Sequence, residues 1–329
     1  MPTIIDVATA AGVSRGTVSR YLNGGKWVSA ESSNAIERAI RRTGYRANQH
    51  ARSLVTGRSN AIAFLLTEPQ DLLFADPTYA PLLRGAADAL SQYQMTLTLL
   101  VAGNEKERNN VLNYLSAGHV DGALLVSTHE NEPLIDLLLE RNVPLVSCGL
   151  SIGKADRVAS VSVDESAGAR AMIEHLRSRG RSKIAMITGP LDLPGGLYRL
   201  EGYRSTLGSD FDESLVAVGD YTHESGIRGM TELLERYPDI DAVFAASDTM
   251  AAGALQVLRK AGKRVPDDVA VGGFDDSGLA ANLDPPLTTM RQPFAQISSE
   301  MVSLLLSVIE GGPVKSITLP ATLVVRETT

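Results

Sequence analysis

Two sets of side chains in this sequence have the types and spacing that binding chemistry needs. Near the amino terminus, Arg15 and Arg20 project from the outward face of a predicted short helix, and a guanidinium can donate two hydrogen bonds to O6 and N7 of guanine. Far along the chain, Asp248 and Asp275 each end a buried apolar run, where a carboxylate can accept hydrogen bonds from adjacent sugar hydroxyls. The residues therefore suggest nucleic-acid recognition at one end and polyol recognition elsewhere.

The distribution of charge supports this separation. Residues 3–58 carry nine Lys or Arg against three acidic side chains, a net charge of +6, whereas the 329-residue chain as a whole has a net charge of −7. A small basic module on an acidic body is typical of a nucleic-acid binder whose other part has a different task.

Three short helices are predicted for residues 1–47. The first spans Thr3 to Ala11, with Thr3 as its cap and a turn at Gly12 after it. Ser14 caps the second helix, which packs through Val18, Tyr21 and Leu22. The third helix runs from the cap Ser29 to Arg42 and stops at Gly44; its buried stripe consists of Ala35, Ile36, Ala39 and Ile40. Two short helices joined by a glycine turn form a helix-turn-helix.

Motifs in the same residues resemble the LacI/GalR family of bacterial repressors, and the resemblance extends over essentially the whole chain. They are Ile5-Asp6-Val7-Ala8, Ala11-Gly12-Val13-Ser14, Thr17-Val18-Ser19-Arg20, Leu22-Asn23-Gly24, Val28-Ser29 and Gly44-Tyr45. The resemblance implies a transcriptional repressor that binds double-stranded DNA as a homodimer. A two-fold dimer predicts a pseudopalindromic operator.

In this family the second helix lies in the major groove, so the resemblance assigns base reading mainly to Arg15 and Arg20. Gly16 departs from the larger polar residues frequent at its position and is expected to let the helix or a neighbouring arginine approach the DNA closely. Phosphate or sugar contacts are expected for Thr3, Ser14, Thr17, Ser19, Asn23 and Trp27. Helix solvation is an equal alternative for Thr17 and Ser19, and packing on the third helix is the alternative for Trp27.

Residues 48–60 are predicted to be a hinge. The segment from Asn48 to Thr56 is short, polar and without an apolar stripe, so it should be mostly unfolded alone in water. The resemblance implies that it becomes a helix in the DNA-bound dimer, where Leu54 is wedged into a base step of the minor groove. Asn48, Ala51 and Arg52 are the accompanying DNA contacts. The alternative for Leu54 is an ordinary linker residue.

Residues 61–329 are predicted to form an α/β effector-binding and dimerisation domain. Apolar runs separated by helix-length segments imply parallel strands with crossover helices; they are Ala61–Thr67, Met95–Val101, Gly122–Ser127, Pro144–Cys148, Val158–Val163, Lys183–Thr188, Leu215–Gly219, Ala242–Ala246 and Val269–Phe274. The length exceeds one doubly wound sheet, which predicts two similar parallel-sheet subdomains. The resemblance makes them of periplasmic-binding-protein type, 61–162 plus 291–320 and 163–290 plus 321–329, with crossovers near Val161–Val163, Met290–Pro293 and Leu319–Ala321.

A small molecule is expected in the cleft between these halves, at the carboxyl ends of the strands. The resemblance gives Arg199 the role of holding ligand hydroxyls or carboxylates, and Tyr221 that of stacking on the ligand. The full predicted set is Phe74, Asp76, Tyr79, Ser127, Arg199, Tyr221, Ser247, Asp248, Asp275 and Gln292. Helix capping is the alternative for Asp248, and a place in the core is the alternative for Tyr79.

Three alternative functions fit these residues less well: a purine-responsive regulator, a sugar receptor of transport type and a glycosidase. Phe74 and Tyr221 could sandwich a purine co-repressor, but the carboxylates and Arg199 favour a sugar inducer, as does a broad resemblance to regulators of β-glucoside and cello-oligosaccharide use. A sugar receptor of transport type has no use for residues 3–58. A glycosidase acting through the adjacent Asp275 and Asp276 fails, because neighbours along a chain do not flank a scissile bond.

The remaining composition predicts no cofactor and no metal site. The single Cys148 excludes an internal disulfide, and the five His are scattered. No apolar amino-terminal signal and no run of eighteen apolar residues is present, so we expect a cytoplasmic protein that makes no membrane contact. The resemblance to repressors implies a protein that is not an enzyme.

Overall fold

The computed structural model describes residues 2–22, 27–45 and 58–329. The chain separates into two compact units, Met1–Asn60 and Ala61–Thr329. The DNA contacts predicted for Asn23, Asn48, Ala51, Arg52 and Leu54 lie outside the described residues. No helix in the described ranges is long and apolar enough to cross a membrane.

The amino-terminal unit contains three short helices, as the sequence predicts: α1 (Ile4–Ala11), α2 (Arg15–Leu22) and α3 (Ala30–Thr43). Thr3 and Asp6 form a reciprocal capping box at the start of α1, and Ser29 caps α3. The left-handed Gly12 and Gly44 end α1 and α3, a conformation that glycine adopts without steric cost. The core that holds the helices together centres on the buried side chains of Val7, Val18 and Ile36.

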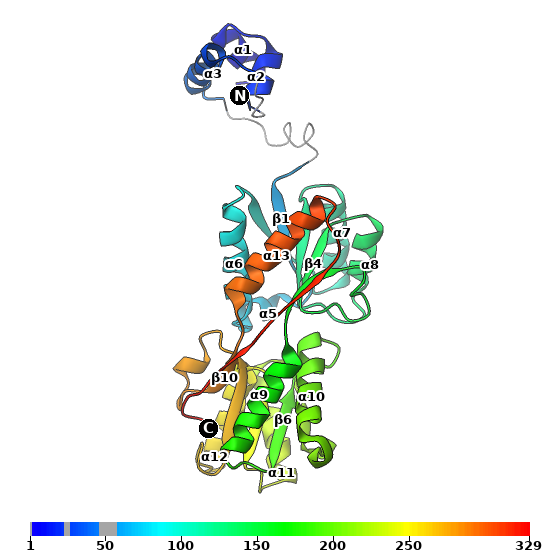
Figure 1. The fold of residues 1–329 in the computed structure, drawn as a ribbon, viewed down its shortest axis with the longest axis vertical. Coiled ribbons are helices and arrows are strands. Elements are labelled where there is room, and N and C mark those ends of the chain that lie inside the picture. Colours follow the sequence, from blue (N-terminus) through cyan, green and yellow to red (C-terminus); the bar gives the residue numbers. More distant parts are fainter. Residues whose placement is uncertain (1, 23–26, 46–57) are drawn as a thin grey trace. The chain divides into compact units, whose positions relative to one another are not determined.

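The first lobe of residues 61–329 is built on a six-stranded, wholly parallel sheet in the order β11-β5-β4-β3-β1-β2. Its strands are β1 (Ala61–Leu66), β2 (Thr96–Val101), β3 (Gly122–Val126), β4 (Leu145–Cys148), β5 (Ala159–Val163) and β11 (Ser316–Leu319). Both faces are covered (Figure 1). The helices α6 (Tyr79–Ser91) and α13 (Phe294–Ile309) pack on one core, while α7 (Glu105–Ser116) and α8 (Pro133–Glu140) pack on the other.

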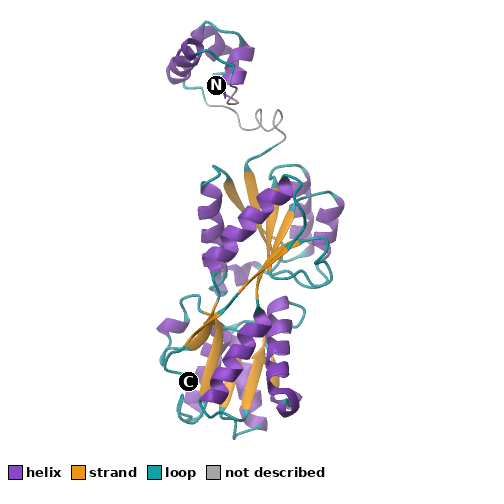
Figure 2. Ribbon diagram, viewed as in Figure 1, coloured by secondary structure: helices purple, strands orange, loops and turns teal. Residues whose placement is uncertain are grey.

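The second lobe repeats this arrangement in the order β12-β10-β9-β8-β6-β7, with β12 antiparallel to β10. Its strands are β6 (Ile184–Thr188), β7 (Val216–Val218), β8 (Ala242–Ala245), β9 (Ala270–Asp275), β10 (Thr288–Arg291) and β12 (Thr322–Val324). Figure 2 shows the two sheets, each with helices against it. The predicted fold class, a helical head and two parallel-sheet subdomains, is confirmed.

The helices of the first lobe are α5 (Gln70–Ala75), α6 (Tyr79–Ser91), α7 (Glu105–Ser116), α8 (Pro133–Glu140) and α13 (Phe294–Ile309). Those of the second are α9 (Glu165–Ser178), α10 (Pro194–Leu207), α11 (His223–Arg236) and α12 (Asp248–Lys260), with short 3₁₀ turns at Gly208–Asp210, Glu213–Leu215 and Ala280–Asn282. The chain passes to the second sheet after β5, returns after β10, and passes again between β11 and β12. These passages leave a cleft into which the carboxyl ends of strands from both sheets open.

Candidate functional sites

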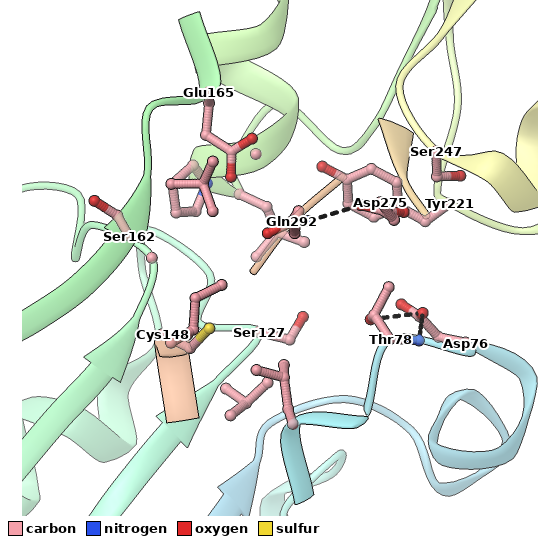
Figure 3. A pocket seen from close by; sticks show the side chains of 18 of the residues that line it. Asp76, Thr78, Ser127, Cys148, Ser162, Glu165, Tyr221, Ser247, Asp275 and Gln292 are labelled. Carbon is pink, nitrogen blue, oxygen red and sulfur yellow. Dashed lines mark hydrogen bonds between the residues drawn. The ribbon is translucent and has the colours of Figure 1, made fainter. Parts of the chain in front are cut away.

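The cleft between the lobes contains about 870 Å³ of space not filled by protein atoms, part of it open to solvent, a size that suits a small molecule. Figure 3 shows side chains from both lobes turned toward this space. Eight of the ten residues that the sequence assigns to a ligand line it: Asp76, Tyr79, Ser127, Arg199, Tyr221, Ser247, Asp275 and Gln292.

Arg199 is the only arginine or lysine among the residues that line this cleft, all of them in the described part of the chain. It projects from α10 and is only 4% exposed. Its Nε donates to Oε2 of Glu165 at 2.7 Å, and its Nη1 donates to the carbonyl of Ala246. The guanidinium carbon lies 3.7 Å from the ring centroid of Phe274, which adds a cation–π contact. The cation is thus fixed before any ligand arrives.

Asp275 is the last residue of β9 and is buried beside Arg199, with Oδ1 3.5 Å from Nη1. Gln292 donates from Nε2 to the same Oδ1 at 2.7 Å (Figure 3). Burial raises the pKa of the Asp275 carboxyl well above its ordinary value, although the charge of Arg199 opposes this shift. A carboxyl in this setting can exchange hydrogen bonds with a hydroxyl group in either protonation state.

Backbone strain is concentrated around the cleft. Ser127, Tyr221 and Asp275 line it with φ angles of 56°, 67° and 116°, values that residues with a side chain rarely adopt. Such conformations persist only where the surrounding structure enforces them, and they are common at binding sites. This observation supports the assignment of these residues to a site.

The first lobe contributes the opposite wall. Asp76 follows α5, and its Oδ1 accepts hydrogen bonds from the backbone N and the hydroxyl of Thr78 at 2.8 and 2.7 Å (Figure 3). Burial raises the pKa of the Asp76 carboxyl. Tyr79 is 7% exposed; it lines the cleft and also packs in the core of its lobe. The two predictions for it, a cleft residue and a core residue, are therefore compatible.

Asp248 occupies a different place from the one predicted. It begins α12, but Ser247 is the cap, because its hydroxyl accepts from the backbone N of Met250. The buried Asp248 carboxylate instead accepts hydrogen bonds from the backbone N of Asp276 at 2.7 Å and from the hydroxyl of Thr289. It does not line the cleft. In this structure the Asp248 carboxylate therefore holds the turn after β9 and does not face the cleft.

Phe74 also differs from its prediction. It lies on the six-residue helix α5 with 88% of its surface exposed, and it is not among the residues that line the cleft. A stack of a purine between Phe74 and Tyr221 is therefore not preformed in this structure.

Sequence reasoning missed several residues of the cleft. Glu165 resembles an ordinary acidic residue in the first turn of a helix, and Ser162 is concealed within an apolar strand. The hydroxyls of Ser162 and Thr128 are buried and lack a hydrogen-bond partner in the described part of the chain, a state that usually has a reason such as a missing ligand or water.

Cys148 also lines the cleft. Burial raises the pKa of its thiol to about 12, so the thiol is neutral near pH 7.

A histidine connects the two lobes at the edge of the cleft. Nε2 of His129 lies 3.0 Å from Oε1 of Glu68 in the first lobe, and Nδ1 lies 2.7 Å from Oδ2 of Asp192 in the second. The backbone N of Glu130 also donates to the Asp192 carbonyl at 2.9 Å. The hydrogen bond to Glu68 contributes most to raising the pKa of His129 to about 9. At neutral pH the imidazolium therefore joins two carboxylates across the cleft.

This link predicts a pH-dependent part of the stability. Because the folded pKa of His129 is about 9 against 6.5 for the free side chain, the contribution is complete below pH 6.5 and is lost as pH rises through 9. We expect His129→Gln to lower the unfolding free energy by about 1 kcal/mol at pH 6.5, a modest value because the pair is partly exposed, and by almost nothing above pH 9.5. Urea unfolding at both pH values measures this difference.

His119→Gln is the matched control, because His119 is exposed and stacks on Tyr114 within the first lobe. Its effect should not change between the two pH values. A His129→Gln deficit that is the same at pH 6.5 and 9.5 would contradict a charged link.

The amino-terminal unit presents a polar surface on α2. Arg15, Gly16 and Arg20 are exposed, and Nε of Arg20 donates to the carbonyl of Gly16 at 3.2 Å. A Cβ at Gly16 would meet only the Ser14 hydroxyl, so the fold of the head does not require glycine there. The exposed face of α2 therefore carries two guanidinium groups, with Gly16 between them exposing backbone that no side chain covers.

The polar residues around α2 have local roles as well. The Thr3 hydroxyl donates to Asp6, and the Ser14 hydroxyl accepts from the backbone N of Thr17 at 3.1 Å. Ser19 is partly buried. Trp27 is 88% exposed, so the alternative that it packs on α3 is wrong.

Comparison with known proteins gives two family matches. Residues 3–48 match the bacterial regulatory proteins of the lacI family, and residues 173–329 match a periplasmic binding protein-like domain. The chain is 44% identical over 314 residues to the HTH-type transcriptional regulator CelR of Thermobifida fusca, covering 94% of this chain and 92% of the relative. It is 32% identical over 311 residues to the ribose operon repressor of Escherichia coli K12, covering 93% and 92%.

Two solved structures resemble the chain over its length. The CelR-cellobiose complex superposes with a TM-score of 0.81 at 41% identity and covers 100% of both chains. The lac repressor dimer bound to operator and the anti-inducer ONPF superposes with a TM-score of 0.87 at 27% identity, covering 100% of this chain and 99% of the other.

Proposed function

Since this chain belongs to the LacI family of bacterial regulatory proteins, we propose that it is a transcriptional repressor whose affinity for its operator is changed by a small carbohydrate bound between the two lobes. One observation carries the proposal most directly: the whole chain aligns with a regulator that was solved with cellobiose. We propose a β-glucoside or an oligosaccharide as the inducer, and a role in regulation without catalysis.

The DNA-binding half of the proposal rests on the exposed face of α2. Arg15 and Arg20 would read base edges in the major groove, while Gly16 lets the backbone approach. Contacts to phosphate or sugar are proposed for Thr3, Ser14, Thr17, Ser19 and Trp27. The protein would act as a homodimer on a pseudopalindromic operator, because one three-helix head makes few contacts and a two-fold pair doubles them.

The effector half rests on the chemistry of the cleft. Asp275 and Asp76 supply acceptors for hydroxyl groups, and the ring of Tyr221 can lie against the C–H face of a sugar. Hydrogen bonds from Arg199, Gln292, Ser127 and Ser247 would complete the site, with Tyr79 closing the first-lobe wall.

The proposed mechanism is linkage between the two binding events. A sugar that contacts both lobes binds more tightly when they are closed, so it favours the closed arrangement over the arrangement that binds operator. The same coupling free energy must then weaken operator binding. Asp248 takes part indirectly, because it holds the turn that carries Asp275 and Asp276.

This proposal predicts that cellobiose, or another small β-glucoside, stabilises the full-length protein. At a concentration one hundred times its dissociation constant the sugar should add about 2.7 kcal/mol to the unfolding free energy, measured as a thermal shift. The same sugar should release a selected operator in a gel-shift assay.

Galactitol, an acyclic polyol, is the control ligand, because it has vicinal hydroxyls but no ring face for Tyr221. Stabilisation by purines but not by any saccharide, together with tighter operator binding, would replace the inducer proposal by a co-repressor.

A further inference from the structure

We propose that Glu165 makes this cleft selective for uncharged saccharides, so that phosphorylated and carboxylated sugars are excluded. The inference rests on the proposed function, because it specifies the class of sugar within it. It depends on how Glu165 uses the donors of Arg199, on the charges around the cavity, and on the position of Glu165 at a helix start.

The donors of Arg199 are largely committed to the protein. Nε is bound to Glu165 and Nη1 to the Ala246 carbonyl, which leaves Nη2 without a hydrogen bond in the described part of the chain. A phosphate or carboxylate is bound best by two parallel N–H groups of one guanidinium. Glu165 engages Nε, and Nη1 faces both the Ala246 carbonyl and Oδ1 of Asp275, so each pair of parallel N–H groups already has one member engaged. Arg199 therefore retains Nη2 as a donor for a hydroxyl oxygen but has no free fork for an anion.

The charges of the cleft act in the same direction. Three acidic side chains, Asp76, Glu165 and Asp275, line it against one guanidinium, and Figure 3 shows Glu165 and Asp76 on opposite sides of the cavity. Burial raises the pKa of both Asp76 and Asp275, so the environment already disfavours the negative charge that it contains. A ligand with a further negative charge would lose its hydration in these surroundings and would meet acidic side chains instead of a free cation.

Glu165 lies at the start of α9, beside the buried guanidinium of Arg199. It is the first residue of the 14-residue helix α9, and it pairs with a buried cation at 2.7 Å. Helix starts bind anions through their free N–H groups and the helix dipole, and an adjacent arginine would strengthen such a site. The Asp164 carboxylate already caps this helix start by accepting from the backbone N of Ala167 at 2.9 Å. The Glu165 carboxylate adds a second internal anion, which is bound to Arg199. Substitution of Glu165 by a neutral residue of the same shape removes a negative charge that an anionic ligand would otherwise face.

The test compares three probes on the full-length protein by titration calorimetry: cellobiose, cellobiose 6′-phosphate and cellobiouronic acid. The wild type should bind cellobiose at least a hundred times more tightly than either anionic probe. In Glu165→Gln, whose amide oxygen can still accept from Arg199, this ratio should narrow at least tenfold. An unselective wild type, or an unchanged ratio in Glu165→Gln, would overturn the proposal.

Glu174→Gln is the matched control. It removes the same charge from the same helix at an exposed position, nine residues and thus about 13 Å further along α9, and its ratio should stay within twofold of wild type. If Glu165→Gln does not fold, Asp76→Asn on the other lobe tests the same repulsion and should also narrow the ratio. A protein that binds operator but none of the three sugars would instead contradict the effector class of the proposed function.

Discussion

The Arg199→Leu protein is expected to lose its response to sugar and to unfold with a free energy about 3–5 kcal/mol lower than wild type. Arg199 is 4% exposed and is paired with Glu165 and Asp275. Its removal leaves two carboxylates in a medium of low polarity without their cation, and it also ends the contact with the ring of Phe274. Urea unfolding measures the loss of stability, and the thermal shift with cellobiose measures the loss of binding.

A double substitution separates these two effects. The double variant Arg199→Leu, Glu165→Leu also lacks the Glu165 carboxylate, which the single variant leaves without its cation. At least half of the lost stability should therefore return, as when buried ion pairs are replaced by apolar side chains. The sugar response should not return, because the donor is still missing. A single Arg199→Leu protein that keeps a full thermal shift with cellobiose would show that Arg199 does not hold the ligand.

The fold was largely predictable because most strands are continuous apolar runs. The nine predicted runs correspond to β1–β9 within one residue at each end. The strands β10, β11 and β12 were foreseen only as crossover positions. They have three or four residues, and their sequences Thr288–Arg291, Ser316–Leu319 and Thr322–Val324 mix polar and apolar side chains, so no apolar run marks them. Pairing with a neighbouring strand, rather than local propensity, makes them strands.

The site was predictable where a polar residue ends a strand, and less so where tertiary structure decides. Asp275 and Arg199 meet in the cleft as expected. Asp248 follows the strand β8 and begins α12, but its carboxylate accepts from the backbone N of Asp276, which sequence spacing does not reveal. The partners of His129 lie 61 and 63 residues away along the chain. Such a contact depends on how the two lobes meet, so no local sequence pattern predicts it.

The second large effect is expected in the head, at Arg15. In Arg15→Ala each half-site loses a donor pair to guanine, about 1–3 kcal/mol, and a two-fold dimer loses it twice. Affinity for a symmetric operator obtained by selection on the full-length protein should fall by about thirty-fold to twenty-thousand-fold. Affinity for an operator mutated at the guanine that Arg15 contacts should barely change. Fluorescence anisotropy on both duplexes at fixed salt measures this discrimination.

Arg38→Ala provides the control, because Arg38 is an exposed arginine of α3 and its removal subtracts the same charge from the head. A loss of charge alone weakens binding to all sequences alike and lowers the dependence on salt, so Arg38→Ala should keep the wild-type ratio between matched and mismatched operators. If Arg15 reads a base, the ratio of affinities for the matched and mismatched operators should approach one in Arg15→Ala and stay at its wild-type value in Arg38→Ala. If both variants preserve it, the guanidinium of Arg15 contributes charge and register, and the sequence preference must come from Arg20 or from the shape of the DNA.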